Sequence, residues 1–194
     1  MKKLLIATHN AGKKKEISEV LGSIGWEVLT LDDISLSVPE PEETGTTYEE
    51  NALIKAKHAG DISGLLTIAD DSGIEVEALP GELGVYSSRF AKSDEERVQK
   101  LLKTMEGQTK RGAKFVSCIV IYDPVTQMHN SFFGEVVGKL AEEPRGSRGF
   151  GYDPIFIPNG YEKTFGELGN EVKNTISHRA KALGKMKKYL QNYN

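Results

Sequence analysis

The chain has 194 residues, a length that suits one domain with a substantial core. Hydrophobic residues make up 38% and charged residues 27%, as is ordinary for a soluble globular protein. The formal net charge of −3 argues against a nucleic-acid polymer as partner, because such a partner requires a basic face. The net charge does not exclude a small polyanion, because a local cluster of Lys and Arg can bind one.

The N-terminal segment is apolar but short. Residues 3–8 predict a first strand, because their apolar core is too short for a signal peptide and runs into polar residues and lysines. No segment is long enough to cross a membrane. The single cysteine, Cys118, lies in the apolar run 115–121, which predicts a buried thiol and excludes an internal disulfide. We therefore expect a cytoplasmic protein without membrane contact.

Helical and strand-like patterns alternate through the first half of the chain. The first predicted helix is capped by Gly25, and a strand at 26–31 and an acidic loop at 39–45 follow it. Thr47 and Glu50 predict a capping box for the next helix. The inward face of the first helix consists of apolar residues at helical spacing: Ile17, Val20, Leu21 and Ile24.

The second half predicts one more capped helix, a hairpin and a C-terminal helix. Ser93 caps a helix whose apolar face ends at Met105, and strands at 113–123 and 128–138 flank a turn. The last helix starts near Ser177 and directs four residues inward: Ala180, Leu183, Met186 and Leu190. Because helices alternate with strands early and a hairpin follows, we expect an α/β fold with a mixed sheet.

Two adjacent carboxylates, Asp70 and Asp71, follow the apolar run 65–69. Ser72 and Gly73 then predict a turn into a second strand at 74–79. Carboxylates at the end of a buried strand would face the edge where α/β sheets bind ligands. Two carboxylates at such a short distance repel each other unless a cation lies beside them. Mg²⁺ is a suitable cation, because it binds carboxylate oxygens and substrate phosphates. The competing interpretation, which the motif alone favours, is an Asx-type turn that ends the strand.

A strand-to-helix turn at residues 8–13 has the composition of a phosphate site. Backbone N–H groups at a helix N-terminus, with Lys13 one turn into the helix, can bind phosphate oxygens. The segment is not a P-loop, because the Walker spacing is absent. The alternative is a solvated, lysine-rich helix face capped by Asn10, and this segment alone does not decide between the two.

Two further segments contain more polar and glycine residues than a loop or helix start needs for its structure. The acidic loop carries Glu42 and Glu43, with Lys55 on the helix after it, although acidic loops are usually only solvated. Aromatic residues between glycines at 150–153 offer flat faces for a base, although core packing also explains them. Lys173, His178 and Arg179 stand at or before a helix start, where surface residues are also common.

Carboxylates for Mg²⁺, cations for phosphates and aromatic rings for a base together indicate a nucleoside triphosphate. The sequence resembles the Ham1-type inosine triphosphate pyrophosphatases from Thr8 to about Leu183. One departure is His9, where many members have Gly. The resemblance rests on motifs in this order: 8–13 (THNAGK), 42–45 (EETG), 50–52 (ENA), 69–73 (ADDSG), 86–89 (YSSR), 150–154 (FGYDP) and 177–183 (SHRAKAL).

The resemblance implies hydrolysis of ITP, dITP and XTP to the monophosphate and pyrophosphate by a Mg²⁺-dependent homodimer. It also implies an elongated, two-lobed α/β domain over residues 1–194, with a mixed twisted sheet and a central active-site cleft. Asp71 is implied as metal ligand and proton acceptor, and Glu42 as a second metal-site carboxylate. The implied substrate-binding residues are Thr8, His9, Asn10, Ala11, Gly12, Lys13, Ser72, Phe150, Gly151, Tyr152, Asp153, Lys173, His178 and Arg179.

The chemistry of the reaction agrees with these roles. Attack of water at the α-phosphorus requires a carboxylate that takes a proton and cations that stabilise the departing pyrophosphate. Asp71 suits the first role, and Lys13 with help from Lys55 suits the second. We predict that Asp70 and Glu43 support the metal site.

Two other functions compete with this interpretation. A Maf-like nucleotide pyrophosphatase has a related fold but prefers other bases, and the motifs at 150–153 and 177–179 favour the Ham1-type enzyme. A non-catalytic nucleotide sensor would not need acidic residues around the scissile phosphate, because they repel an anionic ligand unless a metal is present.

Overall fold

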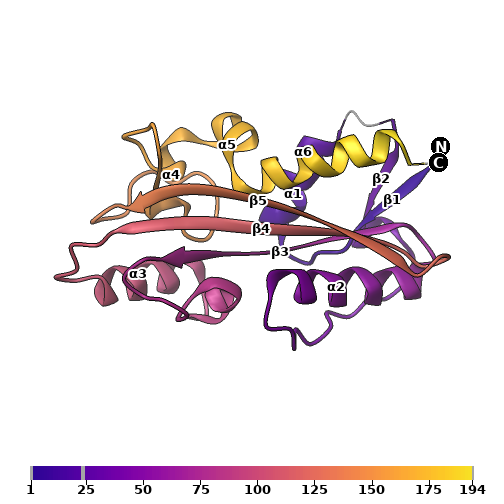
Figure 1. The fold of residues 1–194 in the computed structure, drawn as a ribbon, viewed down its shortest axis with the longest axis horizontal. Helices are drawn as coiled ribbons and strands as arrows, with labels where there is room; N and C mark the ends of the chain where they lie inside the picture. The colour runs from indigo at the N-terminus through magenta and orange to yellow at the C-terminus, as the bar shows by residue number, and fades with distance from the viewer. Residues whose placement is uncertain (1, 23–24, 194) are drawn as a thin grey trace. The chain divides into compact units, whose positions relative to one another are not determined.

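The computed structural model describes residues 2–22 and 25–193 and has an α/β fold, as predicted (Figure 1). Six strands form one mixed sheet in the order β2-β1-β3-β4-β5-β6. The strands are β1 Lys3–Ile6, β2 Glu27–Thr30, β3 Thr67–Val76, β4 Gly112–Asp123, β5 Met128–Leu140 and β6 Phe156–Pro158. The α-helices are α1 Ala11–Leu21, α2 Tyr48–Ser63, α3 Asp94–Thr104, α4 Phe165–Leu168, α5 Asn170–Ile176 and α6 His178–Gln191.

The sheet is mixed because neighbouring strands pair in parallel at one edge and antiparallel at the other. Strand β1 pairs parallel with both β2 and β3, whereas β5 pairs antiparallel with β6. The chain divides into two compact units. Unit 1 comprises Met1–Asp71, Ser117–Gly134 and Arg179–Asn194, and unit 2 comprises Ser72–Val116 and Glu135–His178.

Unit 1 has a core on each face of its strands. Side chains alternate along a strand, so Leu4 and Ile6 of β1 pack against α1 and α6, whereas Leu5 and Ala7 pack against α2. In Figure 1, α1 and α6 accordingly lie on one side of β1 and α2 on the other. In β3, Ile68 belongs to the first core and Ala69 to the second. This alternation determines where the next two residues point.

Unit 2 has one hydrophobic core that joins its helices to strands β3, β4 and β5. Val98, Leu101 and Met105 of the α3 segment contribute to it, as predicted. Three aromatic rings pack in the same core: Phe115 of β4 meets Phe156 edge to face at 4.7 Å between centroids, and Phe156 stacks on Phe165 at 5.4 Å. In Figure 1, α3 lies on one side of the strands of this unit, and α4 and α5 lie on the other.

Several predicted helix starts are confirmed by their capping bonds. The hydroxyl of Thr47 accepts from the backbone N–H of Glu50, and the Glu50 side chain returns the bond as a capping box. Ser93 likewise accepts from the backbone N–H of Glu96. The first helix ends earlier than predicted, at Leu21, and its predicted residue Ile24 lies outside the described residues.

The prediction of a turn at Ser72 and Gly73 was wrong. Strand β3 continues from Thr67 to Val76 without interruption. Glycine is required at position 73 for another reason: a Cβ there would lie 2.0 Å from the carbonyl oxygen of Gly84. Ser87 then hydrogen-bonds both the N–H and the carbonyl of Ile74. The Ser-Gly pair therefore marks a close backbone approach along one long strand.

Cys118 of β4 is fully buried, as predicted. Burial, with the negative charge of Glu49 nearby, raises the pKa of its thiol to about 12. Because only the thiolate is reactive, we expect no modification of the native protein by a disulfide reagent at pH 8. The same reagent should titrate one thiol per chain in 6 M guanidinium, whereas rapid labelling of the native protein would contradict the burial.

No helix among the described residues is long and apolar enough to cross a membrane.

Candidate functional site

Asp70 and Asp71 project from opposite faces of β3. The alternation that directs Ile68 towards α1 and α6 and Ala69 towards α2 continues into the carboxylates. The contacts agree, because Asp70 meets residues of α1 and α6, whereas Asp71 meets Lys55 of α2. The two carboxylates that were predicted together as metal ligands thus have different partners in the protein, and the structure does not bring them to one point.

Asp70 anchors a buried network of charges in unit 1. Its Oδ1 accepts from the Ser117 hydroxyl at 2.5 Å, and its Oδ2 lies 3.0 Å from a guanidinium nitrogen of Arg179 and 2.9 Å from Lys13 Nζ. Arg179 also pairs with Glu16 of α1. Burial opposes ionisation of Asp70, but Arg179 and Lys13 outweigh it and hold the pKa well below its usual range. Arg179, Lys13 and Ser117 thus favour the anionic form of Asp70.

Arg179 is 2% exposed and engages two carboxylates. The resemblance implied that it binds substrate. The structure places it within the Glu16–Arg179–Asp70 network, where it holds α6 to α1 and β3. Glu16 and Ser117 were missed by sequence reasoning. The available signal was the position of Glu16 beside the inward residue Ile17 on a helix whose other charged residues are mainly lysines.

Asp71 belongs to a second charged group, which is centred on Lys55. Its Oδ1 lies 2.7 Å from Lys55 Nζ, and the same ammonium lies 2.6 Å from Glu43 Oε1. Asp71 Oδ2 is buried without a hydrogen-bond partner among the described residues. Burial raises the pKa of Asp71, and Lys55 only partly offsets this effect. Burial also disfavours the Lys55 ammonium, but Asp71 and Glu43 outweigh it and raise the Lys55 pKa.

The acidic loop is held against α2 rather than merely solvated. The buried side chain of Asn51 accepts from the backbone N–H of Gly45 at 2.8 Å, and a Cβ on Gly45 would lie 2.6 Å from that oxygen. This anchor directs Glu43 towards Lys55. Glu42, which was predicted as the second metal-site carboxylate, is exposed, and its neighbour Glu43 pairs with Lys55.

The predicted phosphate turn forms the N-terminus of α1. Asn10 is its cap, because its side chain accepts from the Lys13 backbone N–H at 2.9 Å. The Lys13 side chain is 16% exposed and turns towards Asp70, and its burial lowers its pKa. In the rest of the turn, His9, Asn10 and Ala11 are exposed, whereas Thr8 and Gly12 are half-buried. The exposed turn with an inward lysine is compatible with the predicted phosphate contacts.

The predicted base-binding residues belong to unit 2, apart from Arg179. Lys173 Nζ lies 4.5 Å from the centroid of the half-buried Phe150 ring and pairs with the buried Asp153 at 2.5 Å. Asp153 also accepts from the Phe150 backbone N–H, which fixes that segment. A Cβ on Gly151 would meet nothing within 4 Å, so the space beside it is open. Lys173 and Asp153 thus hold the Phe150 segment from its ring and from its backbone.

The remaining predicted residues of unit 2 have internal contacts. Tyr152 is buried and its hydroxyl donates to the Ser87 carbonyl at 2.8 Å, which favours the core-packing interpretation. His178 is buried and stacks on Phe115 at 4.8 Å. Ser72 follows Asp71 in β3 and is half-buried.

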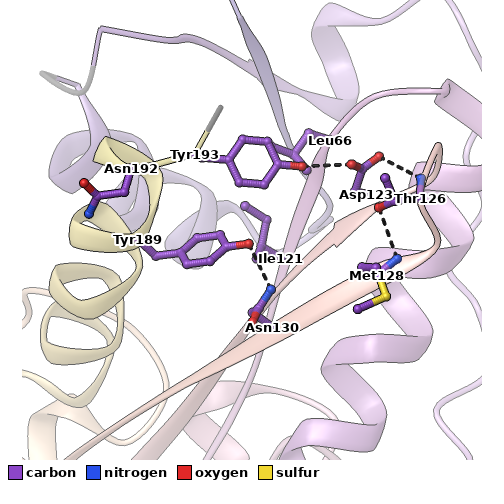
Figure 2. A pocket seen from close by; sticks show the side chains of 9 residues that line it. All are labelled: Leu66, Ile121, Asp123, Thr126, Met128, Asn130, Tyr189, Asn192 and Tyr193. Carbon is purple, nitrogen blue, oxygen red and sulfur yellow. Dashed lines mark hydrogen bonds between the residues drawn. The ribbon is translucent and has the colours of Figure 1, made fainter.

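A pocket of about 440 Å³ in unit 1 contains none of these residues. Figure 2 shows its tyrosines, with Tyr193 directed at Asp123 and Tyr189 at Asn130. It lies where the tip of the β4–β5 hairpin meets the end of α6, and its wall includes Leu66, at the start of the run whose other end carries Asp70 and Asp71. We assign it no part in the candidate site.

Comparison with known proteins agrees with the motifs. A sequence profile of the Ham1 family matches residues 4–189. The chain is 49% identical over 185 residues to a dITP/XTP pyrophosphatase of Deinococcus radiodurans, covering 94% of this chain and 90% of that protein. It is 44% identical over 196 residues to the Bacillus subtilis protein of the same name, covering 98% of each.

Solved structures lead to the same family. A HAM1 protein from Coxiella burnetii superposes with a TM-score of 0.88 at 38% identity over the full length of both chains. The Ham1 protein of Staphylococcus aureus gives a TM-score of 0.84 at 38% identity over 98% of each chain. Sequence profile, relatives and folds therefore coincide over nearly the whole length, and the chain belongs to the Ham1 family.

Proposed function

We propose that this protein hydrolyses the non-standard purine nucleoside triphosphates ITP, dITP and XTP to the monophosphate and pyrophosphate in a Mg²⁺-dependent reaction. Such a reaction removes these nucleotides from the cellular pool. The names of the relatives support the substrate class. The observation that carries the proposal is Asp71, a buried carboxylate with one oxygen unpartnered among the described residues and a raised pKa.

The residues around Asp71 fit a Mg²⁺ ion that binds together with substrate. Across the described part of the chain, no group of three or more Asp, Glu, His or Cys side chains converges on one point. Mg²⁺ does not require such a cage, because one or two carboxylates plus phosphate oxygens and waters commonly hold it. We assign Asp71 and Glu43 to this role. The bound ion would supply charge neutralisation on the phosphate oxygens.

Asp71 is also the proposed proton acceptor for the attacking water. Water attacks the α-phosphorus, the bond from this phosphorus to the bridging oxygen breaks, and pyrophosphate leaves. A carboxylate with a raised pKa is a stronger base than an exposed one. Lys13 and backbone N–H groups at the start of α1 would bind the phosphate chain. The Phe150 face, supported by Lys173 and Asp153, would bind the base.

We expect the enzyme to turn over ITP and XTP far faster than ATP and GTP. The base-edge argument applies to ATP, whereas guanine keeps O6 and its rejection must depend on its 2-amino group. Inosine and xanthine present an acceptor at O6, whereas adenine presents a donor amino group there. An unpaired buried polar group costs about 1–3 kcal/mol, and sites built on such pairing can discriminate by roughly 10⁴-fold. The test compares kcat/KM for dITP, XTP, dATP and dGTP at one Mg²⁺ concentration, with pyrophosphate measured through added inorganic pyrophosphatase.

The same assay separates the competing functions. Comparable kcat/KM values for dITP and dATP would overturn the selectivity. Binding of dITP without release of pyrophosphate would indicate a nucleotide sensor. A clear preference for standard or pyrimidine triphosphates would indicate a Maf-like activity.

Homodimeric assembly and a cytoplasmic location complete the proposal. Resemblance to the family supports the dimer, and the relatives named as dITP/XTP pyrophosphatases, which act on the nucleotide pool, support the location. Light scattering after size-exclusion chromatography tests the dimer, with a monomer mass of 21.4 kDa as reference.

A further inference from the structure

The ammonium of Lys55 bridges the carboxylates of Glu43 and Asp71. The three side chains are 11%, 19% and 7% exposed, so little solvent screens their charges. Together they carry a formal charge of −1 rather than the −2 of the two carboxylates alone. The carboxylates that suit a divalent cation are therefore already neutralised in part by a cation of the protein itself.

An ammonium and a divalent cation compete at such a group. Each needs the same carboxylate oxygens, and the two cations repel each other at short distance. Lys55 cannot easily turn to another carboxylate, because it lies on the helix face packed towards β3, whereas its neighbour Lys57 is exposed and pairs with Asp61. A triphosphate, with several negative charges, offers the ammonium a new partner of suitable chemistry.

We propose that Lys55 is a resident counter-ion that keeps the divalent-cation affinity of Glu43 and Asp71 low until a polyphosphate enters. The cation and the polyphosphate then bind in a coupled manner, because the polyphosphate receives the Lys55 ammonium as the cation takes the two carboxylates. This inference rests on the proposed function, since it takes these carboxylates as the metal site. It adds an order of binding and a residue that sets it.

The test measures Mn²⁺ and Mg²⁺ binding to the nucleotide-free protein by calorimetry. Lys55→Met should bind the cation at least about 10-fold more tightly than the wild type, a coupling of ordinary size between two ligands. The matched control is Lys57→Met, two residues along the same helix, which should bind as the wild type does. An unchanged or weaker affinity in Lys55→Met would overturn the proposal.

A stability readout guards against a poorly folded variant. Loss of the ammonium leaves two carboxylates facing each other, so Lys55→Met should melt lower than the wild type in EDTA. Millimolar Mg²⁺ should raise its melting temperature more than that of the wild type, because a ligand that binds only the folded state stabilises it. A Lys55→Met protein that Mg²⁺ fails to stabilise would contradict the proposal.

The double variant Glu43→Gln, Lys55→Met should lose the cation affinity that Lys55→Met gains. Such a loss would assign the cation binding to the Glu43 and Asp71 carboxylates. Hydrolysis of dITP by the wild type is measured separately. Wild-type activity with unchanged metal binding in Lys55→Met would reject the counter-ion role alone. Tighter metal binding in Lys55→Met without any wild-type dITP hydrolysis would reject the proposed function and leave the counter-ion role standing.

Discussion

Replacement of Asp71 by Asn should lower kcat for dITP by about 10²–10⁴-fold, the usual contribution of a positioned general base. The amide keeps the shape of the carboxylate but removes its charge and its basicity. The Lys55 ammonium would retain Glu43, at 2.6 Å, as its partner, so the local fold should persist. Binding of the triphosphate should weaken much less than turnover, because the phosphate contacts proposed for Lys13 and the start of α1 are unchanged.

The measurement is kcat and KM at saturating Mg²⁺ for the wild type and Asp71→Asn. Asp32→Asn is the control, because it also removes a carboxylate paired with a lysine, but at an exposed position outside the site. Circular dichroism and the melting temperature establish that both variants are folded. Near wild-type turnover in Asp71→Asn would remove this residue from the mechanism.

Local signals in the sequence predicted the elements well. The capping residues Thr47 and Ser93 start their helices as expected, because a side-chain oxygen three residues before a backbone N–H is a short-range feature. The hairpin around residues 123–128 also depends on neighbours in sequence. The short helices α4 and α5 were not predicted, since segments of 4 and 7 residues carry too little periodicity.

Long-range contacts set the limits of the prediction. Ser72 and Gly73 have the composition of a turn, and only the approach of the Gly84 carbonyl, 11 positions further on, reveals why glycine is needed in a strand. The pairing of Glu43 with Lys55 accompanies the bond from Gly45 to Asn51, which holds the loop and connects residues six positions apart. Partners of Asp70 come from α1, β4 and α6, so its internal role was invisible in the local motif.

Arg179 allows a sharp distinction between an internal ion pair and a base-reading donor. Arg179→Met should reduce the free energy of unfolding by about 3–5 kcal/mol, because it leaves the buried carboxylates of Glu16 and Asp70 without their shared cation. For a chain of this length, that loss lowers the melting temperature on the order of 10 °C. Urea denaturation of both proteins at pH 7 gives the difference in free energy.

The control is Lys14→Met, which removes the cation of an exposed pair with Asp32 and should cost no more than about 1 kcal/mol. The double variant Glu16→Gln, Arg179→Met should lose less stability than the sum of the losses in the two single variants. In Arg179→Met the Glu16 carboxylate is buried without its cation, and the second substitution removes that unpaired charge. If Arg179→Met unfolds as the wild type does while the dITP preference over dATP collapses, Arg179 reads the base and the buried network contributes little. A large loss of stability with retained selectivity for dITP establishes that Arg179 is structural. An arginine held by two buried carboxylates then joins α6, α1 and β3 and does not recognise the substrate.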